Sequence, residues 1–163
     1  MNQIQAIKRT SKYSNRPHLT INIDGQPLDI ILHELYPKKN LIGLVPTLLS
    51  WLDDPRERKL VWDRFESEQK QIVPILMCPE DVDLWCTVVV VEIEKNENSV
   101  RWLRIGLDDS IFHDNSSDSI GTTVEWLDKI EPMVFDKTAY KKLELEFKAE
   151  IIKDELKQLL ENL

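Results

Sequence analysis

The amino-acid sequence predicts an α+β fold: a central, mostly antiparallel sheet of about five to six strands, a helical hairpin after the first two strands, and a long C-terminal amphipathic helix. Two patterns carry this prediction. Apolar runs rich in β-branched residues at 72–78 and 86–93 are typical of strands covered on both faces. From Asp136, a favourable N-cap, to residue 163, apolar side chains recur every three to five residues, which predicts one amphipathic helix.

The chain before the central strands is expected to form a β-hairpin and then a helical hairpin. Residues 19–23 alternate apolar and polar side chains, 24–25 are Asp-Gly, a strong hairpin-turn signal, and 26–32 resume as the second strand. A helix is expected over 44–52. A second helix is expected from Asp54-Pro55, with the aspartate as its cap.

That second helix has an apolar stripe of Leu60, Val61 and Phe65. The charged residues of its first turns are expected on the opposite, solvated face. They are Arg56, Glu57, Arg58 and Lys59.

Three further segments complete the predicted architecture. Residues 100–107 return as the partner of the second apolar strand, 108–121 form an exposed polar loop anchored by Ile111 and Phe112, and 122–127 add one more strand. The basic segment 1–18 shows no clean period and is expected to be a flexible arm. Residues 19–163 are then expected to form a single domain, the usual number for this length.

Negative charge is concentrated in the middle of the chain. The 163 residues carry a net charge of −8, but residues 76–136 alone hold 14 acidic and 4 basic side chains, a balance of −10. An acidic field repels nucleic-acid phosphates and anionic lipid, so neither nucleic acid nor a membrane is an expected partner. A basic protein is expected instead.

The compartment and the state of the cysteines are inferred together. No apolar run approaches the length of a membrane span, and no secretory signal is visible at the N-terminus, so a cytoplasmic protein is expected. The two cysteines are Cys78 and Cys86. A disulfide between them would close a small loop, but a reducing cytosol disfavours it, and two buried free thiols are expected.

Recognisable catalytic and cofactor motifs are missing. The histidines His18, His33 and His113 fit no zinc-protease spacing, and with only four glycines the chain has neither a glycine-rich phosphate loop nor a nucleophile elbow. The loop 108–121 has the composition of a calcium site without the register of an EF-hand. We therefore expect no cofactor, no metal and no enzymatic activity. A small cytosolic enzyme with an unrecognised carboxylate site is the alternative.

Five tryptophans are an enrichment for this length. Four of them fall on predicted helices or strands and are expected in or beside the core: Trp51, Trp62, Trp102 and Trp126. Trp85 differs because it ends the short acidic connection 79–85. An aromatic side chain surrounded by carboxylates suits a binding hot spot for a basic surface, and a tryptophan that caps the end of the sheet is the alternative.

Three stretches taken together resemble a known class of protein. Residues 43–49, residues 73–93 with the run Cys-Pro-Glu-Asp-Val-Asp, and residues 100–108 are similar to small uncharacterised bacterial proteins. Some of those proteins look like immunity proteins of polymorphic toxin or contact-dependent growth inhibition systems. The resemblance implies a protein that binds the toxin domain of a neighbouring cell's effector and blocks its active site, and it carries over no individual site residue.

Charge and resemblance lead to one functional expectation. The chain is expected to inhibit a basic, nuclease-type toxin domain by electrostatically complementary binding. The candidate partner-binding residues are Glu80, Asp81, Asp83, Trp85, Asp108, Asp109, Asp114 and Asp118. They form one patch only if the two connections 79–85 and 108–121 lie at the same end of the sheet. An adaptor that oligomerises through its C-terminal helix is a further alternative.

Overall fold

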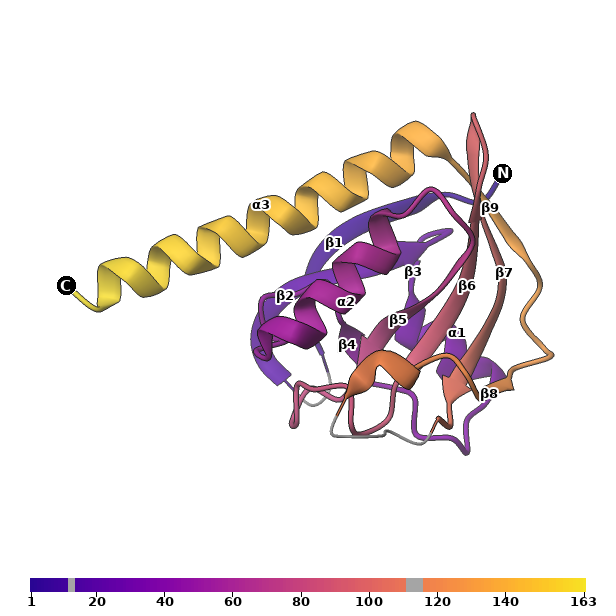
Figure 1. Ribbon diagram of the computed structural model, residues 1–163, viewed down its shortest axis with the longest axis horizontal. Coiled ribbons are helices and arrows are strands. Elements are labelled where there is room, and N and C mark those ends of the chain that lie inside the picture. The colour runs from indigo at the N-terminus through magenta and orange to yellow at the C-terminus, as the bar shows by residue number, and fades with distance from the viewer. Residues whose placement is uncertain (12–13, 111–115) are drawn as a thin grey trace.

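The computed structural model describes residues 1–11, 14–110 and 116–163, and its strands form two sheets (Figure 1). The smaller sheet has the order β1-β2-β3. The larger sheet has the order β4-β5-β6-β7-β8, and β9 also pairs with β7. All of these pairings are antiparallel. The predicted α+β class with mostly antiparallel strands is therefore confirmed.

The bounds of the elements are as follows. The strands of the smaller sheet are β1 (Ile4–Ser11), β2 (Ser14–Ile23) and β3 (Gln26–Pro27). The strands of the larger sheet are β4 (Val45–Pro46), β5 (Gln71–Met77), β6 (Val89–Lys95), β7 (Ser99–Asp108), β8 (Val124–Trp126) and β9 (Met133–Asp136). The helices are α1 (Leu28–Leu35), α2 (Pro55–Glu66) and α3 (Lys137–Glu161), with a short 3-10 helix η1 (Ser117–Ser119).

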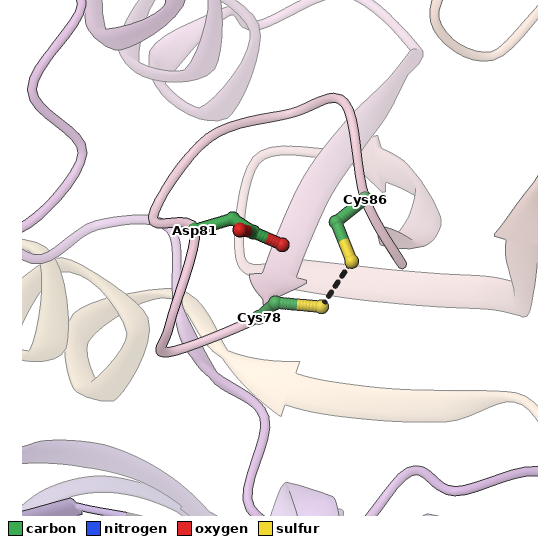
Figure 2. Close-up of side chains that lie close together, drawn as sticks. All are labelled: Cys78, Asp81 and Cys86. Atoms are coloured by element: carbon green, nitrogen blue, oxygen red, sulfur yellow. Dashed lines mark hydrogen bonds between the residues drawn. The ribbon is translucent and has the colours of Figure 1, made fainter.

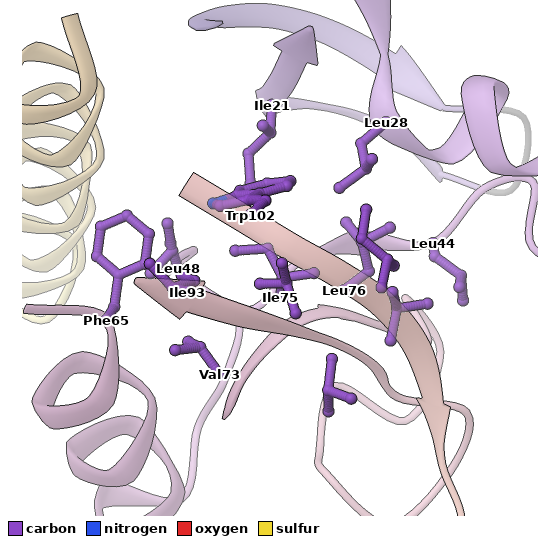
Figure 3. Packing of buried hydrophobic residues seen from close by; sticks show 14 of the residues in the cluster. Ile21, Leu28, Leu44, Leu48, Phe65, Val73, Ile75, Leu76, Ile93 and Trp102 are labelled. Carbon is purple, nitrogen blue, oxygen red and sulfur yellow. The ribbon is translucent and has the colours of Figure 1, made fainter. Parts of the chain in front are cut away.

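The core lies around β5 and β6, the two strands predicted from their β-branched runs. Residues 73–77 and 88–91 are buried without alternation, as expected for strands covered on both faces. Figure 3 shows Ile21 and Leu28 reaching this core from β2 and α1, while Phe65 reaches it from α2. One hydrophobic cluster therefore joins the two sheets and the helices.

The prediction of a flexible arm at 1–18 is wrong for the described residues, because β1 and β2 form a long antiparallel hairpin there. Tertiary partners balance two of its basic side chains. Lys8 Nζ lies 3.1 Å from a carboxylate oxygen of Glu150 on α3, and Arg9 Nη2 lies 2.8 Å from that of the buried Asp29 on α1. Residues so far away in sequence give no local signal.

The second strand predicted at 26–32 is also largely wrong. The turn itself is confirmed, since Asp24 and Gly25 have φ of 51° and 85°, the left-handed conformation that such hairpin turns require. However, β3 ends at Pro27 and the chain continues as α1. Leu28 and Leu32 are buried one turn apart on the same helical face, a spacing that outweighs the β-branched content of the segment.

The predicted helical hairpin is half right. The helix expected at 44–52 is absent: β4 pairs with β5, and turns follow it. Thr47 fixes this segment to β5, donating from its N–H to the Ile75 carbonyl (3.0 Å) and from its hydroxyl to the Pro74 carbonyl (2.7 Å). By contrast, α2 begins as predicted, and the Asp54 carboxylate caps it by accepting the Arg56 N–H (2.9 Å).

The C-terminal helix α3 is present as predicted, and the Asp136 carboxylate caps it by accepting the Ala139 N–H (3.0 Å). Only its first half packs against the core, through Tyr140, Leu143 and Phe147. The second half makes polar contacts, such as that of Asp154 with Ser50, before its last turns extend beyond the rest of the fold (Figure 1), and it leaves large apolar side chains exposed. Among the described residues, no helix combines the length and the apolar character that a membrane span requires.

Candidate functional site

The two acidic connections lie at the same end of the larger sheet. Because β6 is antiparallel to both β5 and β7, the connection after β5 and the connection after β7 leave the sheet on one side (Figure 1). The Asp108 N–H donates to the Val88 carbonyl (3.0 Å), where the two connections meet the sheet. We call this region the acidic end: the described residues of 78–88 and 108–123. The arrangement required for a single acidic patch is therefore present.

Glu57 on α2 ties the two connections together. Its side chain is only 3% exposed, and its Oε2 accepts hydrogen bonds from the Leu84 N–H (3.0 Å) and the Ser117 hydroxyl (3.2 Å). Burial raises the pKa of this carboxyl, and the two hydrogen bonds partly oppose that rise.

The prediction that Glu57 lies on the solvated face of α2 is thus wrong. The missed signal is its spacing of four from Val61 and eight from Phe65, both buried, which places the three residues on one helical face.

Arg64, also on α2, organises the same end from the other side. Its Nη1 donates to the carbonyls of Ile72 (3.1 Å) and Ile120 (2.8 Å), and its Nη2 donates to the carbonyl of Asp118 (3.1 Å). Burial lowers the pKa of this guanidinium, while the carboxylates of Asp118 and Asp108 favour its charged form. Arg64 thereby fixes the backbone of the second connection, a role that sequence reasoning did not assign to it.

Two of the candidate carboxylates shape the connections themselves. The Asp83 carboxylate accepts the N–H of Trp85 (3.0 Å), which closes a tight turn. The Asp108 carboxylate accepts the Ser110 hydroxyl (2.8 Å) and the Gly121 N–H (2.9 Å), which holds together the two ends of its loop. These side chains support the surface as well as adding charge to it.

The other described candidate carboxylates are exposed and make no such contacts. Within the described residues, no hydrogen bond or ion pair engages the carboxylates of Glu80, Asp81, Asp109 and Asp118. Asp83 and Asp108 likewise have no lysine or arginine within ion-pair distance among those residues. Asp114, together with the expected anchors Ile111 and Phe112, lies outside the described residues. The acidic end therefore carries six described carboxylates that no ion pair balances.

Trp85 stands between two hollows of this surface, and its side chain is 50% exposed. The larger hollow, about 540 Å³, is also lined by Arg56, Lys59 and Asp118. The smaller, about 240 Å³, is also lined by Asp108 and other residues of the second connection. The other four tryptophans pack in or against the core as predicted, and Trp85 is the one of the five whose side chain is half exposed.

Charge is mixed on the α2 side of Trp85. Lys59 pairs with Asp63 within α2, and Arg56 Nη2 lies 3.6 Å from the carboxylate of its neighbour Asp54. The unbalanced negative charge therefore lies on the connections and not on the helix. The loop side of Trp85 is therefore the more negative of its two sides.

Cys78 and Cys86 meet at the base of the first connection (Figure 2). Cys86 is exposed, so the prediction of two buried thiols is wrong for it, while Cys78 is partly buried. The Cys78 thiol donates to the Cys86 sulfur with 2.8 Å between the sulfur atoms. Burial, reinforced by that contact, raises the pKa of Cys78 to about 11. A carboxylate oxygen of Asp81 and the two sulfur atoms all lie within 4.8 Å of one another, the only such group of potential metal ligands among the described residues.

Comparison with known proteins gives no match for this chain. No protein-family model matches the chain, and neither the curated proteins nor the solved structures contain a significantly similar one.

Proposed function

We propose that this chain is a protein-binding module whose acidic end recognises a basic surface of another protein. One observation carries the proposal: six described carboxylates gather around a half-exposed tryptophan, and none has an ion-pair partner among the described residues. Gathering like charges costs free energy in the isolated protein through mutual repulsion. A partner that brings lysine and arginine side chains removes that cost.

The roles within the surface follow from its geometry. The exposed carboxylates supply long-range attraction, which speeds association with a basic partner. Trp85 supplies a large apolar contact of the type that dominates binding free energies at interfaces. Glu57 and Arg64 hold the two connections in place before binding, so less conformational entropy is lost when the partner docks.

The partner class is inferred from chemistry and from the resemblance to immunity proteins. A nuclease active site is basic because it binds phosphates, and an acidic surface is attracted by the same field. We infer that the partner is a nuclease-type toxin domain and that binding blocks its substrate cleft without any reaction at the acidic end.

The experiment is co-purification with the product of the adjacent gene, followed by affinity measurements on two variants of equal charge change. The neutral acidic-end variant combines Glu80→Gln, Asp81→Asn, Asp109→Asn and Asp118→Asn. The control variant removes four exposed carboxylates elsewhere through Glu34→Gln, Glu97→Gln, Glu131→Gln and Glu161→Gln.

We expect the neutral acidic-end variant to lose affinity by roughly tenfold to a hundredfold, corresponding to about 1.4–2.8 kcal/mol. The control variant should stay within about threefold of the wild type, because its removed charges lie away from the docking surface. Equal affinities of the two variants would refute the assignment of the acidic end.

A second candidate function, self-association through α3, rests on a different observation. An apolar stripe with the 3-4 spacing of self-pairing helices runs along α3 and is more than half exposed. It consists of Leu145, Ile152, Leu156, Leu159 and Leu163. Such a stripe suits a second copy of the chain. Light scattering coupled to size exclusion tests this: a dimer that Leu156→Lys dissociates and that Gln158→Lys does not is the expected result, and a wild-type monomer at high concentration would exclude it.

A further inference from the structure

We propose that Cys78, Asp81 and Cys86 bind a thiophilic divalent cation, with Zn²⁺ as the expected occupant, at the base of the first acidic connection. Figure 2 shows the Asp81 carboxylate turned toward the two sulfur atoms. The three potential ligand atoms lie within 4.8 Å of one another. The site shares Asp81 with the acidic end, but its tests measure metal binding by the isolated chain, so either proposal can fail while the other stands.

The local chain path creates the cluster. Cys78 directly follows the last residue of β5, and Cys86 comes three residues before β6 begins, so the two cysteines lie where adjacent antiparallel strands meet the connection. Between them the chain turns back, with the Val82 N–H donating to the Cys78 carbonyl (3.1 Å) and Val82 in the left-handed region at φ 45°. That turn brings Asp81 over the sulfur atoms.

The ligand set matches the preferences of zinc. Zinc binds thiolate sulfur at about 2.3 Å and carboxylate oxygen at about 2.0–2.2 Å in tetrahedral geometry, which sets two sulfur ligands about 3.8 Å apart. The sulfur atoms are now 2.8 Å apart, so an opening of about 1 Å would admit the ion. Cys86 and Asp81 are exposed, which leaves their side chains room to adjust. Three ligands from the chain leave a fourth position for water.

Electrostatics favour a cation over a disulfide at this place. The surrounding carboxylates of the acidic end attract a divalent cation and repel glutathione disulfide, which is itself anionic. The cation instead displaces the thiol protons when it binds: M²⁺ and two thiols give two metal–sulfur bonds and release two protons. Affinity should therefore rise with pH.

The first test uses the reduced wild-type chain and Co²⁺, a spectroscopic substitute for Zn²⁺. We expect one equivalent of Co²⁺ to produce a near-ultraviolet thiolate-to-cobalt charge-transfer band, which Zn²⁺ then abolishes by displacement. One equivalent of Zn²⁺ should also protect both cysteines from alkylation, while Mg²⁺ should not, because a hard cation does not bind thiolate. Absence of both the band and the protection would overturn the proposal.

The second test separates a three-ligand site from a simple cysteine pair. Asp81→Asn should weaken Zn²⁺ binding by more than about tenfold, the loss already seen when an outer-shell partner of a metal ligand is removed. Glu80→Gln is the matched control: it removes the neighbouring charge outside the cluster and should change affinity by no more than about twofold. Equal effects of the two substitutions would overturn the role of Asp81.

Mass spectrometry of the wild-type chain supplies the remaining outcome and requires no folded variant. Without reductant or metal, two reduced cysteines are expected. A rapid loss of two mass units in glutathione buffer, together with no change on adding Zn²⁺, would establish a disulfide in place of the metal site. Alkylation of Cys78→Ser and Cys86→Ser then checks that each remaining thiol loses its protection by zinc.

Discussion

The two ends of the larger sheet differ in whether their carboxylates form ion pairs. At the end where β6 turns into β7, three carboxylates pair with lysines from other elements. These ion pairs are Lys137–Glu68 (3.0 Å), Lys148–Glu66 (3.0 Å) and Lys70–Glu94 (3.9 Å). At the acidic end, no ion pair among the described residues engages any of the six described carboxylates. Much of the charge of the first end is thus paired within the fold, although Glu97 in the β6–β7 turn is not, whereas the described carboxylates of the second end have no ion pair.

The contrast extends to one buried carboxylate at each end. Glu144 on α3 is 4% exposed and pairs with Lys141 and, at 3.9 Å, with Lys148. Glu57 on α2 is 3% exposed, and it accepts only a backbone N–H and a hydroxyl. One is held by flexible cations at the surface, whereas the other is an anchor for two loops. Three substitution experiments test whether the two ends differ in this way.

Glu57→Ala should give the largest effect. It leaves the Leu84 N–H and the Ser117 hydroxyl without their acceptor at buried positions, each worth about 1–3 kcal/mol when unsatisfied, so we expect a loss of about 2–3 kcal/mol. Glu144→Ala should cost no more than about 1 kcal/mol, because solvent can reach the lysines that it leaves behind. Chemical denaturation measures both. A larger loss for Glu144→Ala would contradict the division between anchor and surface pair.

A smaller effect is expected when Glu57→Gln is followed across pH. The raised pKa of Glu57 means that the folded state takes up a proton more readily than the unfolded chain. The favourable contribution of this carboxyl is therefore fully present below about pH 4.5, its unperturbed pKa, and is lost as the pH rises through the folded-state value. Relative to Glu57→Gln, the wild type should gain stability as the pH falls from 7 toward 4.5. A difference in unfolding free energy that does not change with pH would show that burial of the charge is not costly.

The smallest effect concerns repulsion within the acidic end. At low ionic strength, the neutral acidic-end variant should exceed the wild type in unfolding free energy by about 0.5 kcal/mol, because neighbouring like charges no longer repel. The gain should vanish in high salt. The control variant should gain less, because its four charges are spread over the molecule. Thermal unfolding at low and high ionic strength measures the difference. An equal gain in both variants would mean that like-charge repulsion is no stronger at the acidic end than elsewhere on the surface.

Local signals in the sequence were sufficient for part of the fold. The central strands β5 and β6 were predicted because an unbroken β-branched run indicates a strand covered on both faces. The caps Asp54 and Asp136 were predicted because capping involves only the next two or three residues. The prediction of a helix over 44–52 failed because this segment is apolar on every side. It therefore lacks the period that distinguishes a helix from a buried irregular segment.

The C-terminal helix shows a different limit. The spacing of its apolar residues predicts a single stripe along the helix. However, Leu156 follows Phe147 by nine positions, or about two and a half helical turns, and therefore points to the opposite side. Phe147 is buried and Leu156 is 55% exposed. A helical-wheel projection places the two residues on different faces. The sequence alone still does not indicate which turns of the helix pack against the core and which extend beyond it.

The sequence predicts the acidic charge of the candidate site, but it does not predict the residues that hold the site in place. The acidic connections and Trp85 were identified because composition and position along the chain are visible in the sequence. Whether the connections share an end depended on strand order, which periodicity does not encode. The supporting roles of Glu57 and Arg64 were not predicted, because they depend on contacts that form only on folding. The partners of Glu57 lie 27 and 60 positions away, and those of Arg64 lie 8 to 56 positions away.

The most direct test of the central claim is the association rate of the chain with the co-purified product of the adjacent gene, measured against ionic strength. If the acidic end guides docking, the wild-type and control-variant rates should fall steeply, by more than about tenfold from low to high salt. The neutral acidic-end variant should start lower and fall less. A wild-type rate that is indifferent to salt, or a neutral acidic-end variant with the same salt dependence as the wild type, would contradict the account.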